Sequence, residues 1–443
     1  MKIKCIYKFG GLKILDKFII NGGKRLYGSV SINGAKNAVA AILPATILAQ
    51  GPCVIENVPN ISDVINILSI LSEMGADVKL LNKSSIQIDT TRITKPLVPY
   101  HLAKQMRASY YFLGVLLAKF NRAEVSYPGG CNFGVRPIDQ HLKGFRSLGA
   151  RDSVDQGGMI NIQAEELTGS RIYLDMASVG ATINIMLAAV KANGLTVIEN
   201  AAKEPHIVDL ANFLNSIGAD IMGAGTDVIK IHGVQNFTKT TYSVIPDQIE
   251  CGTYMIMAAA TKGDVLVKNI IPKHMEAITS KLQKMGVEIQ EFDDAIRVSV
   301  PGELVKNSVK TDTYPGFPTD MQPQITALLT LAEGTSIVTE NIWDNRFQYV
   351  DELRRMGANI SVDGKVAVIE GAKNGLTGAP VSATDLRGGA AMVIAGLAAN
   401  GVTEIENIKY IERGYEDIVN KLRGLGADIT RKYVAENELK QAL

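Results

Sequence analysis

The sequence is poor in the residue types that build disulfide frameworks and metal sites. Its 443 residues include four cysteines, five histidines and one tryptophan. The cysteines form no CxxC pair and the histidines are scattered, so neither disulfides nor a structural zinc site is expected. Cys53 and Cys251 stand in apolar segments and are expected to be buried as small hydrophobic residues.

The chain also lacks a charge excess and a long apolar run. Lys and Arg number 46 against 45 Asp and Glu, and the net charge of +1 gives no broad field for binding nucleic acid or an anionic membrane. Any anion must therefore be bound locally. Apolar stretches such as residues 391–400 fall short of the roughly 20 residues that a membrane span needs. No small-residue cleavage site follows the N-terminal segment, so we expect a cytoplasmic protein.

What the sequence does contain is an internal repeat. A phrase of the type Leu/Met/Ile-Gly-Ala-Asp recurs at intervals of 68 to 74 residues, with its glycines at Gly75, Gly149, Gly218, Gly286, Gly357 and Gly426. Each phrase ends an amphipathic pattern such as residues 206–220, so the glycine is expected to supply a left-handed helix cap before a strand. Each unit also carries a helix that is apolar nearly all round, such as residues 178–194, which belongs inside a domain.

Six such units predict an α/β protein (α+β by some schemes) of two similar lobes, each with three units around buried helices. We expect the chain to cross between lobes near Lys36 and Pro246. This places residues 38–245 in one lobe and residues 1–37 with 246–443 in the other, with an active site in the cleft between them. In the second unit AEVSYPGGC replaces the turn phrase that follows the strand elsewhere, and this departure carries Cys131.

Charged residues recur at the expected starts of these helices. The buried helices begin near Lys36-Asn37, Arg107, Ser178, Asp247, Asp320 and Asp385-Arg387, and the amphipathic ones near Arg136, Glu204, Arg346 and Arg413. A cation at a helix N-terminus opposes the helix dipole. Exposure to solvent, or pairing with a neighbouring carboxylate, would explain any single one of these cations. Their repetition instead favours a shared cleft for a small ligand with several negative charges.

Two residues are candidates for the chemistry, and each has a plainer explanation. Asp320, in GFPTDMQ, is either a helix N-cap or a general base. Cys131, in PGGCNFGVRPID, is either a spare surface thiol or a proton donor and nucleophile. The neighbouring glycines loosen its backbone, and a positive field from Arg136 would lower the pKa of the thiol.

Nine segments together closely resemble the UDP-N-acetylglucosamine 1-carboxyvinyltransferase family, the enolpyruvyl transferases of peptidoglycan synthesis within the EPSP synthase superfamily. The resemblance extends from about Phe18 to about Asp428. The segments are SINGAKNA (31–38), KQMRASYYFLG (104–114), PGGCNFGVRPID (128–139), SVGATINIM (178–186), NAAKEPHIVD (200–209), PTDMQ (318–322), NRFQYVDEL (345–353), ATDLRGGAA (383–391) and IERGYEDI (411–418).

This resemblance implies a fold of two lobes, each of three βαβαββ units around buried helices, an inside-out α/β barrel. It implies transfer of enolpyruvyl from phosphoenolpyruvate to the 3′-hydroxyl of UDP-N-acetylglucosamine by addition and elimination, with release of phosphate. The reaction is the first committed step of peptidoglycan synthesis, and thus serves cell wall biogenesis, cell shape and division. It needs no metal and no organic cofactor, and it takes place in the cytoplasm.

The resemblance also assigns roles to residues. Cys131, Asp320, Lys36 and Arg413 are implied as catalytic, with Cys131 as general acid and Asp320 as general base. The implied phosphoenolpyruvate site consists of Lys36, Asn37, Arg136, Arg346, Arg387 and Arg413. The implied UDP-N-acetylglucosamine site consists of Arg107, Arg136, Pro137, Ile138, Asp139, Gln140, Ser178, Val179, Gly180, Asp320 and Ile342.

Cys131 has two further properties by this resemblance: it can add to phosphoenolpyruvate to form an adduct, and it is the target of the covalent inhibitor fosfomycin. Three positions depart from the family pattern. Met176 replaces a frequent lysine near the nucleotide phosphates, Gln248 a frequent arginine, and Tyr111 a common tryptophan.

Two other functions are alternatives. The sister transferase acting on shikimate 3-phosphate shares the lobes and the cations but lacks the cysteine loop. A non-catalytic UDP-sugar-binding paralogue is disfavoured by the presence of Cys131, Asp320, Lys36 and Arg413 together.

Overall fold

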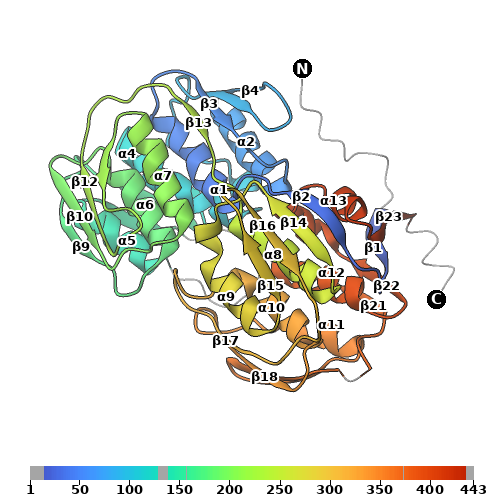
Figure 1. Ribbon diagram of the computed structural model, residues 1–443. Helices are drawn as coiled ribbons and strands as arrows, with labels where there is room; N and C mark the ends of the chain where they lie inside the picture. Colours follow the sequence, from blue (N-terminus) through green and yellow to red (C-terminus); the bar gives the residue numbers. More distant parts are fainter. Residues whose placement is uncertain (1–13, 128–137, 156, 373, 436–443) are drawn as a thin grey trace.

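The computed structural model describes residues 14–127, 138–155, 157–372 and 374–435, which form a mixed α/β fold of two parts (Figure 1). The repeat predicted from the sequence is present. All six repeat glycines have a positive φ, between +88° and +113°. Each follows an amphipathic helix within two residues, where a left-handed residue ends the helix without a Cβ clash. These helices are α2 (Ser62–Met74), α5 (Asp139–Ser147), α7 (Pro205–Ser216), α9 (Glu276–Lys284), α11 (Val350–Arg355) and α13 (Ile418–Gly424).

The six apolar helices are buried, as predicted. In α6 every residue from Ala181 to Ala189 is buried, because no face of the helix carries charge. The set is α1 (Lys36–Ala45), α4 (Tyr111–Phe120), α6 (Val179–Ala189), α8 (Gln248–Ala260), α10 (Gln322–Leu329) and α12 (Leu386–Ala398). Among the described residues, no helix is long and apolar enough to cross a membrane.

Five four-stranded sheets share one topology: a parallel edge pair followed by two antiparallel steps. In sheet order they are β13 (Thr241–Ser243), β3 (Cys53–Glu56), β5 (Ile86–Asp89), β4 (Asp77–Leu80); β9 (Arg171–Tyr173), β10 (Leu195–Glu199), β12 (Val228–His232), β11 (Asp220–Met222); β2 (Tyr27–Ser31), β14 (Asp264–Lys268), β16 (Ala295–Ser299), β15 (Glu288–Glu291); β17 (Ser308–Lys310), β18 (Thr335–Thr339), β20 (Val366–Glu370), β19 (Asn359–Asp363); and β21 (Pro380–Ser382), β22 (Val402–Glu406), β1 (Ile14–Asn21), β23 (Asp428–Ala435).

The second unit departs from this topology. Its sheet has three strands, β6 (Arg122–Ser126), β8 (Met159–Gln163) and β7 (Arg151–Val154). In place of the parallel edge strand there is a single parallel bridge between Leu97 and Glu124. The unit whose sequence breaks the repeat therefore also breaks the sheet pattern, directly before the segment that holds Cys131.

The buried hydrophobic residues form two separate clusters. One runs from Ala35 to Val244, and the other combines Phe18 to Ile32 with Ile249 to Ile429. We call the elements around them the first and second lobes. Strands β1 and β2, blue in Figure 1, lie among the yellow and red strands of the second lobe. Cys53 and Cys251 are buried in the two cores, as expected.

The two passages of the chain between the lobes lie side by side. Gly34 and Pro246 form an antiparallel bridge, and the N–H of Ala35 donates to the carbonyl of Ile245 at 2.7 Å. The N–H of Asp247 donates to the carbonyl of Asn33 at 2.9 Å. This double crossing brings the start of α1 against the start of α8. The domain boundaries at residues 37–38 and 245–246, and the cleft between the lobes as the active site, stay predictions.

Candidate active site

One carboxylate at the lobe boundary holds two of the predicted cations. Asp63 lies in the first turn of α2, and its Oδ2 is 3.0 Å from Lys36 Nζ at the start of α1. Its Oδ1 accepts a hydrogen bond from Arg413 Nε at 2.9 Å, and Arg413 belongs to the second lobe. Burial raises the pKa of Asp63, but Lys36 and Arg413 outweigh burial and lower it.

A second carboxylate holds two further predicted cations. Asp320 lies in the 3₁₀ turn Thr319–Met321, and its Oδ2 accepts from Arg387 Nη2 at 2.9 Å and from Nε at 3.2 Å. Arg346 Nη2 approaches Oδ1 at 3.5 Å. Burial acts to raise the pKa of Asp320, yet Arg387, Arg346 and Lys36 together hold it well below its usual range.

Asp320 is therefore not the helix cap that was the plainer alternative. Helix α10 begins at Gln322 and has no side-chain cap, and the Asp320 carboxylate bonds to arginines instead. The true aspartate caps lie elsewhere. Asp247 Oδ1 accepts from two N–H groups of α8, and Asp385 Oδ1 accepts from the N–H groups of Arg387 and Gly388 in α12.

The two carboxylate clusters belong to one electrostatic region. The charge of Lys36 lowers the pKa of both Asp63 and Asp320. It also acts on His206, whose pKa falls to about 4, mainly through burial. Four cations (Lys36, Arg346, Arg387, Arg413) face three carboxylates (Asp63, Asp320, Asp247), and the oxygens of Asp247 already accept backbone N–H groups, including that of Lys36 at 3.0 Å. The four cations outnumber these three carboxylates, which suits a small anion.

A buried polar network positions Arg387. Its Nη1 donates to the hydroxyl of Tyr415 at 3.3 Å, and this hydroxyl is 2.9 Å from Thr253 Oγ1. Gln324 Nε2 donates to the same hydroxyl at 3.3 Å and to the carbonyl of Asp320 at 2.9 Å. The guanidinium is thus fixed from behind while its other edge faces Asp320, which is the pre-organisation that an anion site requires.

Several predicted UDP-sugar residues gather at the start of α6. The hydroxyl oxygen of Ser178 caps this helix by accepting from the N–H of Ala181 at 3.3 Å. Gly180 leaves no room for a side chain, because a Cβ there would lie 2.9 Å from His141 and from the hydroxyl of Tyr110. Burial first, and then Arg107, lower the pKa of His141 to about 3, so its ring is neutral. Val179 follows the cap and is half-buried.

The segment before and within α5 is also ordered by polar contacts. Gln140 is buried, donates to Asp175 at 2.9 Å and accepts from the Asp175 N–H at 3.0 Å. Its amide also donates to Asp139 at 3.1 Å. Ile138 is buried beside them.

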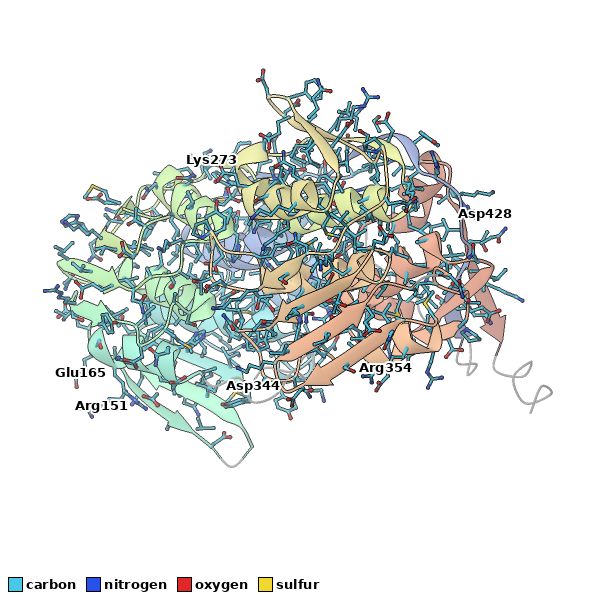
Figure 2. The ribbon with its side chains drawn as sticks, turned by 60° about the horizontal axis from the view of Figure 1, so that its bottom comes forward. Arg151, Glu165, Lys273, Asp344, Arg354 and Asp428 are labelled. Carbon is cyan, nitrogen blue, oxygen red and sulfur yellow. The ribbon has the colours of Figure 1, made fainter. Side chains whose placement is uncertain are left out.

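A contact between the lobes links Arg107, a predicted UDP-sugar residue, to Trp343, the neighbour of another, Ile342. The guanidinium of Arg107 lies 5.7 Å from the ring centre of Trp343 and 5.6 Å from that of Tyr110. Ile342, next to Trp343, donates its N–H to the buried Glu340 at 2.9 Å. In Figure 2, Asp344, which follows Trp343, lies between the first-lobe residues Arg151 and Glu165 and the second-lobe residue Arg354.

The structure brings together part of the predicted site. Lys36, Arg346, Arg387, Arg413 and Asp320 share one region, and Asn37 follows Lys36, half-buried. Each of the four cations also pairs with a carboxylate, which was the plainer explanation for any single one of them. Two expected helix starts are wrong: Arg346 precedes α11, which begins at Val350, and Arg413 ends a 3₁₀ turn. Both stand in connecting segments.

Three predicted residues, Cys131, Arg136 and Pro137, lie outside the described residues. Met176 is 64% exposed, and Gln248 begins α8 directly behind its cap.

Sequence reasoning missed Asp63, Trp343 and His206. Asp63 looked like an ordinary acidic residue in a helix first turn, and only its partners from two distant segments reveal it. His206 was visible within NAAKEPHIVD, and Trp343 as the single tryptophan near Ile342, but neither spacing nor composition marked them.

Comparison with known proteins agrees with this geometry. The family described as EPSP synthase (3-phosphoshikimate 1-carboxyvinyltransferase) matches residues 20–422. The chain is 57% identical to UDP-N-acetylglucosamine 1-carboxyvinyltransferase 3 of Caldanaerobacter subterraneus, over 94% of this chain and 99% of the relative. It is 56% identical to UDP-N-acetylglucosamine 1-carboxyvinyltransferase of Clostridium botulinum, over 94% of this chain and the whole relative.

Solved structures show the same fold. The enolpyruvyl transferase NikO from Streptomyces tendae superposes with a TM-score of 0.86 at 25% identity, over 95% of this chain and 99% of that one. EPSP synthase from Acinetobacter baumannii superposes with a TM-score of 0.73 at 18% identity, over 94% of this chain and all of that one. The predicted fold class is thereby confirmed, and the chain belongs to the EPSP synthase family of enolpyruvyl transferases.

Proposed function

We propose that the protein transfers the enolpyruvyl group of phosphoenolpyruvate to the 3′-hydroxyl of UDP-N-acetylglucosamine and releases phosphate. The observation that carries this proposal is the 57% identity over 94% of the chain to a protein named for that activity. The gathering of four cations around Asp63 and Asp320 supports it, because both substrates are small polyanions.

Lys36, Arg136 and Arg413 hold the phosphate and carboxylate of phosphoenolpyruvate in this proposal, with Arg346, Arg387 and Asn37 completing the site. Arginine suits this task because its planar fork matches the geometry of carboxylate and phosphate. Arg387 is 4% exposed and held from behind by Tyr415, so little reorganisation is needed when charge develops on the substrate.

The reaction proceeds by addition and elimination. The sugar 3′-oxygen forms a bond to C2 of phosphoenolpyruvate while its proton passes to Asp320 and C3 gains a proton from the thiol of Cys131. In the elimination step the thiolate of Cys131 takes a proton from C3, and the C3–H electron pair forms the C2=C3 double bond. The bond between C2 and the phosphate oxygen breaks with its electron pair on the oxygen, and the leaving phosphate takes up the proton held by Asp320. The protein begins and ends the cycle in the same protonation state.

The electrostatics of Asp320 define its share of this work. Arg387 and Arg346 keep the pKa of its carboxyl low, so the group is ionised at neutral pH and always ready to accept a hydrogen bond. The same shift makes it a weak base. Its effect must therefore come from position against the hydroxyl more than from basicity.

The UDP-sugar is expected to lie against Arg107, Arg136, Pro137, Ile138, Asp139, Gln140, Ser178, Val179, Gly180, Asp320 and Ile342. The capped start of α6 supports this, since helix N-termini bind phosphate groups. Gly180 lets this helix start pack directly against His141 and Tyr110. Arg107 and Ile342 come from opposite lobes, so a ligand touching both would hold the lobes together.

The product would enter peptidoglycan synthesis, which places the enzyme in the cytoplasm, where its substrates are made. Cys131 is the expected site of covalent reaction with fosfomycin and of an adduct with phosphoenolpyruvate.

Release of inorganic phosphate tests the proposal. The protein is incubated with phosphoenolpyruvate and either UDP-N-acetylglucosamine or shikimate 3-phosphate, the acceptor named by the family description. Release with the UDP-sugar alone is expected. Release with shikimate 3-phosphate alone would replace the proposed acceptor, and release with neither, while the UDP-sugar binds in calorimetry, would support a non-catalytic binding protein.

A further inference from the structure

The carboxylate of Asp63 has no role in the reaction described above, yet it contacts cations from both lobes. We propose that Asp63 is a positioning residue that aligns Lys36 and Arg413 and joins the two lobes in the reactive state. This inference rests on the proposed function, since it concerns the cations assigned to phosphoenolpyruvate.

Both oxygens of Asp63 are engaged. Oδ1 accepts from Arg413 Nε at 2.9 Å, while Oδ2 lies 3.0 Å from Lys36 Nζ and accepts from Arg413 Nη2 at 3.4 Å. The Asp63 side chain is 6% exposed, and those of Lys36 and Arg413 are 15% and 19% exposed. An ion pair so enclosed has a fixed geometry, unlike a solvated surface pair.

Further hydrogen bonds join the two lobes beside Asp63. The Ser62 hydroxyl donates to the carbonyl of Glu412 at 3.4 Å, and the Asn60 N–H donates to Glu416 at 2.9 Å. Gly414 lies so close that a Cβ there would be 3.2 Å from Lys36 Cδ. The start of α2 therefore lies along residues 412–416, and Asp63 is its charged contact with Arg413.

The charge balance explains why an acidic residue serves an anion site. Lys36 and Arg413 would repel each other if no anion lay between them, and Asp63 places one negative charge against two positive ones. Lys36, Arg413 and Asp63 together keep a net positive charge, which can attract the anionic substrate. A lysine ammonium has three N–H donors, so an oxygen of Asp63 can orient Lys36 while other donors face a phosphate.

The single tryptophan gives a direct measure of lobe contact. Trp343 of the second lobe lies under Arg107 of the first, at 5.7 Å from ring centre to guanidinium. We expect its emission to change when this contact forms or breaks, and no other tryptophan contributes.

The test uses the full chain with Asp63→Asn, which removes the charge and keeps the shape. The matched control is Asp152→Asn, because Asp152 is 9% exposed and pairs with Arg146 through two nitrogens inside the first lobe. For Asp63→Asn we expect kcat/KM for phosphoenolpyruvate to fall at least tenfold while the calorimetric affinity for UDP-N-acetylglucosamine stays within about threefold. The change in Trp343 emission at saturating UDP-sugar is expected to shrink in this variant, and to persist in Asp152→Asn and in the wild type.

Wild-type kcat/KM for phosphoenolpyruvate together with a full emission change in Asp63→Asn would overturn the role of Asp63. Equal losses in Asp152→Asn would also overturn it, since they would show a general effect of losing an ion pair. Should Asp63→Asn not fold, Asp63→Glu keeps the charge and displaces it by one methylene; an unchanged KM for phosphoenolpyruvate in that folded variant would refute the positioning role. Wild-type protein that releases no phosphate would overturn the proposed function instead, and is thus a distinct outcome.

Discussion

Replacing Asp320 by asparagine tests the chemical part of the site. The change keeps the shape of the side chain but removes the charge that binds Arg387 at 2.9 and 3.2 Å and faces Arg346 at 3.5 Å. A positioned general base contributes about 10² to 10⁴ in rate. At about 1.4 kcal/mol per tenfold, this corresponds to a barrier increase of roughly 3 to 5 kcal/mol.

The same change has a cost in stability. Breaking a fully buried ion pair costs about 3 to 5 kcal/mol, because the remaining charge stays buried. The Asp320 side chain is 33% exposed, so water screens part of this loss, and we expect a decrease of about 2 kcal/mol in the free energy of unfolding. Asp264→Asn is the matched control, since Asp264 binds Arg297 through the same two nitrogens, Nε and Nη2, at 2.8 and 2.6 Å, between the central strands β14 and β16 and outside the contacts described for the site.

Phosphate release measures the turnover of each variant, and calorimetry measures its binding of UDP-N-acetylglucosamine. Asp320→Asn is expected to lose about 10² to 10⁴ in kcat, as argued from general-base catalysis, while it still binds UDP-N-acetylglucosamine. Asp264→Asn is expected to turn over like the wild type. A kcat for Asp320→Asn within threefold of the wild-type value, in folded protein, would refute the assigned role. Because the pKa of Asp320 is held low, an acid limb of kcat above pH 5 that disappears in this variant would also contradict our reasoning.

Three further outcomes are expected. Cys131→Asp should keep a proton donor yet escape covalent modification by fosfomycin; a full adduct by mass spectrometry would show that another residue reacts. Gly180→Ala should destabilise the protein by about 1 to 3 kcal/mol through overpacking, whereas the helical Gly424→Ala, with nothing within 4 Å, should be neutral or slightly stabilising; urea unfolding compares them, and equal effects would contradict the packing argument. His206 has a pKa of about 4 when folded against 6.5 when unfolded, so the unfolded state takes up the proton first and stability is lost as pH falls from about 6.5 to 4. His206→Gln should remove about 3 kcal/mol of that loss, at about 1.4 kcal/mol per pH unit; an unchanged pH slope of unfolding would show that His206 is not responsible.

The sequence by itself determined the repeat and the presence of one amphipathic and one apolar helix in each unit. The left-handed glycine after each amphipathic helix is a local requirement, met by the helix end and its cap alone, so all six were visible from spacing. The buried helices were equally visible, because a helix with no polar face has only one stable environment. Even the irregular second unit showed itself in its altered turn phrase.

Only the tertiary structure decided which charges meet. Asp63, Lys36 and Arg413 are separated by up to 377 residues (413 − 36), and Asp320 lies 67 residues from Arg387. Arg346 and Arg413 lie in connecting segments, so no helix pattern could place their side chains. Ion pairing depends on the distance between groups brought together by the double chain crossing and by the packing of two lobes, and that distance is a property of the folded chain as a whole.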